Sequence, residues 1–178
     1  MFALREIFKD KLYALAGAGD IDVFTECFNK WTDTLYLHNF LITNSEALEF
    51  YNLSRVDAIH KIISEAENFE DDLLEIVADE NVSLDSLIFT PLHKNDNFET
   101  PFLQSKAYGA VETPAFLRLY AIRLTDGCYI VVGGLIKTTL SLQECEEGKL
   151  ILATLRQLAN YLDENNFEDS YNISELIL

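Results

Sequence analysis

The dipeptide Asp126-Gly127 constrains the fold of this chain more than any other short feature. It stands between two apolar runs, AFLRLYAIRL before it and CYIVVGGLIKTT after it, and the second run is rich in Val and Ile. Asp-Gly accepts the positive backbone φ angles of a tight turn, so two such runs around it predict an antiparallel hairpin. Gly133-Gly134 inside the second run indicates a β-bulge or a close approach to the backbone.

The rest of the second half is typical of a sheet followed by a helix. After Asp79, short apolar runs alternate with Pro, Asn and Gly, and the segments SLIFTPL and FLQSKAYG predict two further strands. Ser141, with Glu144 three residues later, matches a capping box and predicts the start of a helix that ends near Asn165. The tail after Asn165 is compatible with either a frayed end or a short helix.

Apolar residues in the first half recur mostly at three- and four-residue steps, which is the period of a helix. The pattern predicts an amphipathic helix over residues 3–16, whose charged residues are not compatible with the core of a signal peptide. It also predicts a long helix over residues 21–42. Ser45 and Ser54 are candidate N-caps of a short and a longer helix, and the longer one continues to about Ala78.

Together these patterns predict an α+β fold, in which a helical N-terminal half is followed by a small antiparallel β-sheet closed by a C-terminal helix. We expect residues 1–82 to form the helical region and residues 83–178 the sheet and its helix, packed as one unit. The length of 178 residues suits one domain, or one domain with a helical extension. Hydrophobic residues make up 49% of the chain, which is enough for a sizeable core.

The chain is strongly acidic, with a formal net charge of -17 and a pI of about 4.3. A field of this sign repels phosphate polyanions, so nonspecific binding to nucleic acids or anionic membranes is disfavoured. The charge is uneven along the sequence. Residues 103–143 contain two anions and four cations, namely Lys106, Arg118, Arg123 and Lys137. This stretch is therefore locally positive.

Cysteine and histidine give no signal for a metal or a cofactor. The three cysteines lie far apart without CxxC spacing, and we expect small buried hydrophobes in a reducing cytoplasm. No HExxH, EF-hand or GxxxxGK[ST] pattern occurs. No apolar run approaches the ~18 residues that span a bilayer. We therefore expect a cytoplasmic protein with no cofactor, no metal and no membrane partner.

The candidate site residues are Arg118, Tyr120 and Lys137. In the predicted hairpin Arg118 and Tyr120 share one face of a strand, whereas Arg123, five residues from Arg118, falls on the opposite face. Lys137 lies on the partner strand. A face with Arg, Tyr and Lys can bind a phosphate and handle a proton. The alternative interpretation is that these residues face outward and keep the sheet soluble.

The sequence RLYAIRL…DGCYIVVGGLIKTT…QECEEGKLILATLRQLANYL resembles the second half of the RelE/HigB-type toxins of bacterial toxin–antitoxin pairs. The resemblance covers about residues 101–162. In those toxins a strand that begins with an Arg-aromatic-aliphatic run leads through a turn to a strand that ends in a Lys-Thr motif before a C-terminal helix. The chain is also similar to uncharacterised proteins of Bacteroides-type bacteria that have an LRLYAIR…GGxIK core.

The toxin resemblance implies a RelE-like sheet and a ribosome-dependent mRNA endoribonuclease that a partner antitoxin neutralises. It implies that Arg118 and Lys137 position the scissile phosphate for in-line attack by the ribose 2′-hydroxyl, with Tyr120 as a further candidate. RNA and the ribosome are then the partners. Such toxins are commonly basic and usually have Lys-Lys where this chain has Lys137-Thr138. The second hypothesis is a non-catalytic interaction module whose acidic helices bind a basic protein.

Overall fold

The computed structural model describes residues 1–111 and 115–178 and contains one mixed six-stranded sheet. Across the sheet the strands are ordered β1 (Leu4–Phe8), β2 (Leu12–Leu15), β6 (Tyr129–Ile136), β5 (Leu117–Arg123), β4 (Leu103–Tyr108) and β3 (Phe89–Pro91). β2 and β6 are parallel, and the other neighbouring pairs are antiparallel. The α+β prediction is confirmed at this level, although the sheet is mixed and not purely antiparallel.

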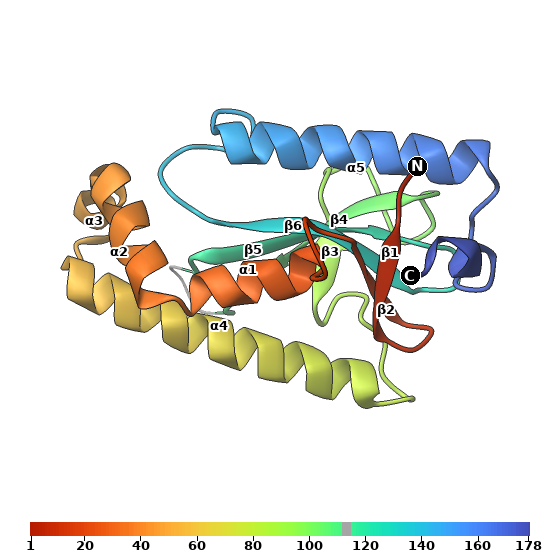
Figure 1. The fold of residues 1–178 in the computed structure, drawn as a ribbon, viewed down its shortest axis with the longest axis horizontal. Coiled ribbons are helices and arrows are strands. Elements are labelled where there is room, and N and C mark those ends of the chain that lie inside the picture. The colour runs from red at the N-terminus through yellow and green to blue at the C-terminus, as the bar shows by residue number, and fades with distance from the viewer. Residues whose placement is uncertain (112–114) are drawn as a thin grey trace.

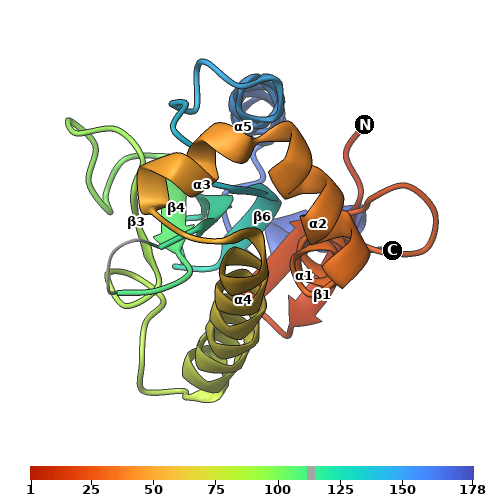
Figure 2. The same ribbon diagram turned by 90° about the vertical axis from the view of Figure 1, so that its left-hand side faces the viewer.

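Helices cover both faces of the sheet (Figure 1). The helices are α1 (Val23–Trp31), α2 (Thr34–Thr43), α3 (Ser45–Tyr51), α4 (Arg55–Ala78) and α5 (Glu146–Glu164), and a 3₁₀ turn η1 (Asn172–Leu176) follows. Figure 2 shows α5 and α4 on opposite sides of the sheet. One apolar core lies between the sheet and α1, α2 and α4, and a second core lies between the sheet and α5.

The predicted hairpin around Asp126-Gly127 is confirmed. β5 and β6 pair from Leu117 to Ile136, and Gly127 takes a φ of 85° in the turn. The glycine pair has both of the properties expected of it. A β-bulge leaves Val132 unpaired next to the glycines, and a Cβ atom on Gly134 would lie 2.8 Å from the Trp31 ring. Gly134 therefore lets α1 approach the sheet closely.

The helix predicted over residues 3–16 is wrong, because this segment forms the hairpin of β1 and β2. All four residues of β2 are buried: Leu12 and Ala14 face one core, and Tyr13 and Leu15 face the other. A strand covered on both faces has a continuous apolar run, which the helical period does not distinguish from a buried helix. The N-terminal half is therefore not all helical, and the predicted 1–82 region contributes two strands to the sheet.

The long helix predicted over residues 21–42 is also wrong in part, because it divides into α1 and α2. The Asp33 carboxylate accepts from the backbone N–H groups of Leu35 and Tyr36 at 2.9 and 3.0 Å, and this capping starts a new helix. The Ser54 cap and the extent of α4 are confirmed, since Ser54 Oγ accepts from Asp57 N–H at 3.1 Å.

The last helix begins later than the capping-box pattern predicts. Ser141 N–H does donate to the Glu144 carboxylate at 2.6 Å, but this contact lies in a turn before the helix. The N-cap of α5 is Cys145, whose Sγ accepts from Gly148 N–H at 3.3 Å. Local sequence therefore located the turn but not the first residue of the helix. Among the described residues, no helix is long and apolar enough to cross a membrane.

Candidate functional site

Strand pairing brings four polar side chains together on the α5 side of the sheet. Arg118 and Tyr120 share a face of β5, as predicted, and the antiparallel register places Tyr108 opposite Arg118 and Lys106 opposite Tyr120. Sequence reasoning missed Lys106 and Tyr108. The alternating pattern of FLQSKAYG, paired with the Arg118 strand, is the signal that could have identified them.

Lys137 follows the end of β6 and completes a pocket of about 270 Å³, here called the Arg118 pocket. Its polar lining comes from β4, β5 and the segment between β6 and α5, and consists of Lys106, Tyr108, Arg118, Tyr120, Lys137, Thr138, Ser141 and Cys145. The three predicted site residues thus lie in one pocket. None of the described lining residues is acidic.

Arg118 is held in place by neutral groups. Its Nη1 donates to the backbone oxygens of Ala115 and Leu117 at 2.8 and 2.9 Å, and its Cζ lies 4.1 Å from the centroid of the Tyr108 ring. Burial lowers the pKa of Arg118, but an arginine remains protonated in a protein. Within residues 1–111 and 115–178 it forms no ion pair. Its charge is therefore oriented, and the Glu65 carboxylate acts on it only from beyond ion-pair distance.

Tyr120 is 5% exposed, and burial raises the pKa of its hydroxyl to about 12. The hydroxyl makes no hydrogen bond to any residue that the structure describes, although the side chain lines the Arg118 pocket. The hydroxyl oxygen is not among the buried polar atoms that lack a partner, so it is open to the pocket. At neutral pH Tyr120 is therefore an O–H donor available to a group in the pocket.

The two lysines add positive charge to the same pocket. Lys137 Nζ donates to the Leu140 backbone oxygen, and Lys106 Nζ lies 5.6 Å from the centroid of the Tyr108 ring. Neither lysine forms an ion pair with the part of the chain that is described. The pocket can therefore bind an anion through three cations and one hydroxyl.

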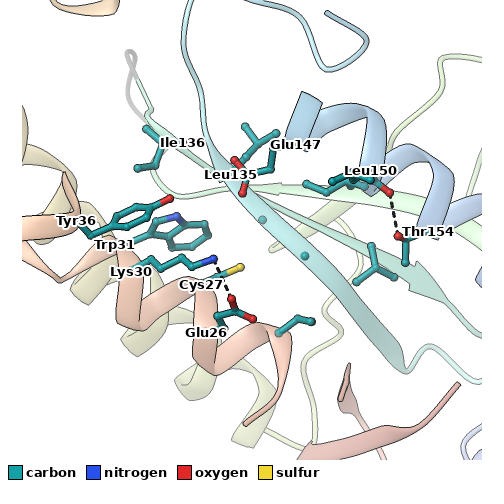
Figure 3. Close-up of a pocket in the computed structure, with 15 residues that line it drawn as sticks. Glu26, Cys27, Lys30, Trp31, Tyr36, Leu135, Ile136, Glu147, Leu150 and Thr154 are labelled. Atoms are coloured by element: carbon teal, nitrogen blue, oxygen red, sulfur yellow. Dashed lines mark hydrogen bonds and ion pairs between the residues drawn. The ribbon is translucent and has the colours of Figure 1, made fainter. Parts of the chain in front are cut away.

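A second pocket, of about 180 Å³, lies between α1, α2 and α5 across Gly133 and Gly134 of β6 (Figure 3). We call it the Lys30 pocket. Here Lys30 Nζ binds Glu26 Oε1 at 2.9 Å, and Glu147, whose carboxyl pKa is raised by burial, lines the same pocket without an ion pair to a described residue. Trp31 and the buried Cys27 complete this side of the pocket. Its geometry is that of packed helices with an ion pair at the rim.

In the part of the chain that is described, no three His, Cys, Asp or Glu side chains gather as metal ligands. Comparison with protein-family models, with curated proteins and with solved structures gives no match to this chain. The Arg118 pocket is therefore the basis of the functional proposal.

Proposed function

We propose that the Arg118 pocket binds a phosphate of RNA and that the chain is a RelE-type endoribonuclease of a toxin–antitoxin pair. The observation that carries this proposal is the gathering of Arg118, Lys106 and Lys137 around one pocket in a chain of net charge -17. Cations that lie together in one pocket repel each other, and an anion relieves this repulsion. Arginine and lysine are the side chains that bind phosphate best.

The pocket has the groups that stabilise the transition state of RNA cleavage. When the 2′-hydroxyl attacks phosphorus, negative charge grows on the phosphate oxygens, and fixed cations lower the barrier most at that point. With Nη1 bound to backbone oxygens, Arg118 retains Nη2 and Nε as donors. Tyr120, protonated at neutral pH, can donate its proton to a phosphate oxygen or to the departing 5′-oxygen.

The described lining contains no carboxylate or imidazole to act as a strong base. The proton of the attacking hydroxyl would then pass to solvent, and in-line positioning would supply much of the acceleration. This fits a nuclease that acts on RNA held by the ribosome. The negative surface elsewhere disfavours free RNA, so specificity for a presented phosphate is expected.

Growth of bacteria that express the chain tests the proposal. The wild type should arrest growth and cleave mRNA, as primer extension detects, whereas Arg118→Ala and Lys137→Ala should do neither. Lys94→Ala is the matched control, because Lys94 is an exposed loop lysine outside the Arg118 pocket. Equal growth of the wild type and of Lys137→Ala would refute nuclease activity at this site.

A second candidate function is a non-catalytic module that binds a basic protein through α4. Its exposed acids Glu67, Asp71, Asp72 and Glu75 form no ion pairs with described residues. Charge complementarity would steer a basic partner to this helix. A pull-down at low and high salt, with the wild type and with Asp71→Lys/Asp72→Lys, tests this function. Binding that changes neither with salt nor with the double substitution would count against it.

A further inference from the structure

Cys145 is placed where a thiol can react with a ligand of the Arg118 pocket. It is the N-cap of α5, and its Sγ accepts from Gly148 N–H at 3.3 Å. The side chain is partly exposed and lines the pocket together with Arg118 and Lys137.

The other two cysteines are buried in the two apolar cores. Cys27 is 9% exposed, and burial raises the pKa of its thiol to about 12. Cys128 is 1% exposed, and burial raises its pKa further. Both thiols are therefore protonated and shielded at neutral pH. They serve as internal controls for the reactivity of Cys145.

An independent observation points to an anionic ligand beside Cys145. Tyr120 lines the same pocket with a hydroxyl that has no partner among the described residues, although the residue is only 5% exposed. The pocket also contains three cations and no acidic side chain in its described lining. A ligand that reaches Cys145 through this pocket is therefore expected to be negatively charged.

We propose that Cys145 undergoes thiol–disulfide exchange with small anionic disulfides, and that the anionic group of the adduct occupies the Arg118 pocket. The Cys145 thiol gives its proton to solvent, and the thiolate attacks one sulfur of the disulfide. The new S–S bond forms as the old one breaks, and the leaving thiolate takes the electron pair. The small disulfide is itself the oxidant. No RNA takes part, so this reaction is independent of the proposed nuclease activity.

The charge of the whole chain allows a clear test, because it favours cationic disulfides whereas the Arg118 pocket favours anionic ones. A net charge of -17 attracts cationic disulfides to an average surface thiol. The nearest acids in sequence, Glu144 and Glu146, act in the same sense, although each has a partner: Ser141 N–H for Glu144, and Lys149 Nζ at 2.7 Å for Glu146. Among the described residues, the cations of the Arg118 pocket oppose this preference.

The test compares the rates of reaction with dianionic 5,5′-dithiobis(2-nitrobenzoate) and dicationic cystamine. Each rate is divided by the rate at which the same disulfide reacts with neutral N-acetylcysteine amide, a reference thiol. Intact-mass spectrometry follows the reactions of the protein. We expect one reactive thiol per chain, located at Cys145 by peptide mapping, and a normalised anionic-to-cationic ratio above one. High salt should bring the ratio toward one.

Variants distinguish the effect of the pocket cations on this ratio from the effect of charges elsewhere on the surface. Lys106→Ala and Lys137→Ala should each lower the ratio about sevenfold, because one unit charge about 7 Å away in water changes each of the two rates about threefold and in opposite directions. Lys94→Ala should leave it unchanged. Cys145→Ser, which keeps an N-cap residue, should abolish labelling. A ratio below one, an adduct mapped to Cys27 or Cys128, or no change in the two pocket variants would each overturn the proposal.

Discussion

Arg118 and Arg123 lie five residues apart on β5 and face opposite sides of the sheet, and their surroundings differ sharply. Arg123 forms a two-pronged ion pair with Asp85 at 2.8 and 2.9 Å, and Asp85 also accepts from the Tyr129 hydroxyl at 2.5 Å. The hydrogen bond to Asp85 raises the pKa of Arg123. Arg118 contacts only backbone oxygens and an aromatic ring among the described residues, and desolvation lowers its pKa.

Arg123 is a charge that stabilises the fold, whereas we propose that Arg118 is a charge that binds a ligand. Arg123 satisfies a carboxylate within the chain, so its role is structural. Lys30 in the Lys30 pocket likewise forms an ion pair with a carboxylate of the chain, that of Glu26. Arg118 has an oriented guanidinium that forms no ion pair with a described residue, although the Glu65 carboxylate acts on it from beyond ion-pair distance, and we propose that it binds a ligand.

The largest expected effect is the difference in RNA cleavage between variants of the two arginines. Arg118→Ala should lower RNA cleavage about 100-fold or more, since it removes a fixed cation from the charged transition state. Arg123→Ala should leave cleavage within about threefold when assayed well below its melting temperature, because a threefold change corresponds to less than 1 kcal/mol of barrier. Primer-extension rates on ribosome-bound mRNA measure both. Equal losses in the two variants would remove the distinction.

Asp85→Ala should reverse the pattern by destabilising the fold without affecting cleavage. Arg123 and Tyr129 would lose their shared partner in a partly buried position, where the Arg123 and Asp85 side chains are 15% and 20% exposed. Breaking such a pair costs about 3 kcal/mol, or about 6–12 °C in melting temperature for a chain of this length. Calorimetry measures this. Asp72→Ala on the exposed face of α4 is the control.

The same ion pair predicts a pH dependence of stability. Burial alone would raise the pKa of Asp85, but its hydrogen bonds to Arg123 and Tyr129 outweigh burial and hold the pKa below its ordinary value. The stabilisation is therefore present above the unfolded pKa of about 3.9 and is lost as the pH falls through the lower folded pKa.

Urea midpoints between pH 2 and pH 6 should consequently fall more steeply for the wild type than for Asp85→Asn. Glu65 contributes with the opposite sign, because burial raises its pKa and its ionisation costs stability as the pH rises. That contribution is common to both proteins and cancels in the difference. Parallel curves would mean that Asp85 does not carry the effect.

The glycine pair gives a smaller and local test. Gly134→Ala should cost about 1–2 kcal/mol, since the new Cβ would lie 2.8 Å from both the Trp31 ring and the Arg118 backbone oxygen. Gly133→Ala is the matched variant, because its Cβ would make only an ordinary 3.5 Å contact with Ile151. Denaturant titration compares them. A loss of equal size in both would show that backbone freedom, and not contact with Trp31, is the cause.

The smallest effect is expected in the Lys30 pocket. The Lys30 and Glu26 side chains are 42% and 38% exposed, so solvent screens their ion pair. Lys30→Met should change stability by about 0.5 kcal/mol or less and should leave RNA cleavage unchanged. A double-mutant cycle with Glu26→Gln measures the coupling. A large effect on cleavage would move the functional site to this pocket.

Several elements followed from local sequence because local chemistry determines them. Asp126-Gly127 set the turn, Ser54 began α4, and the two-residue period placed Arg118 with Tyr120 and apart from Arg123. The hairpin of residues 4–15 did not follow, because a strand buried on both faces lacks alternation. Its place beside β6 depends on a parallel pairing more than 110 residues away in sequence.

The sequence by itself determined the hairpin, its bulge and the common face of Arg118 and Tyr120, since turn geometry and strand period act over a few residues. Only the tertiary structure decided which cations keep a partner. Pairing of β4 with β5 added Lys106 and Tyr108, and the start of α5 added Cys145. Packing on the opposite face joined Arg123 to Asp85, 38 residues away. Charge matching depends on contacts between distant segments, which local patterns do not encode.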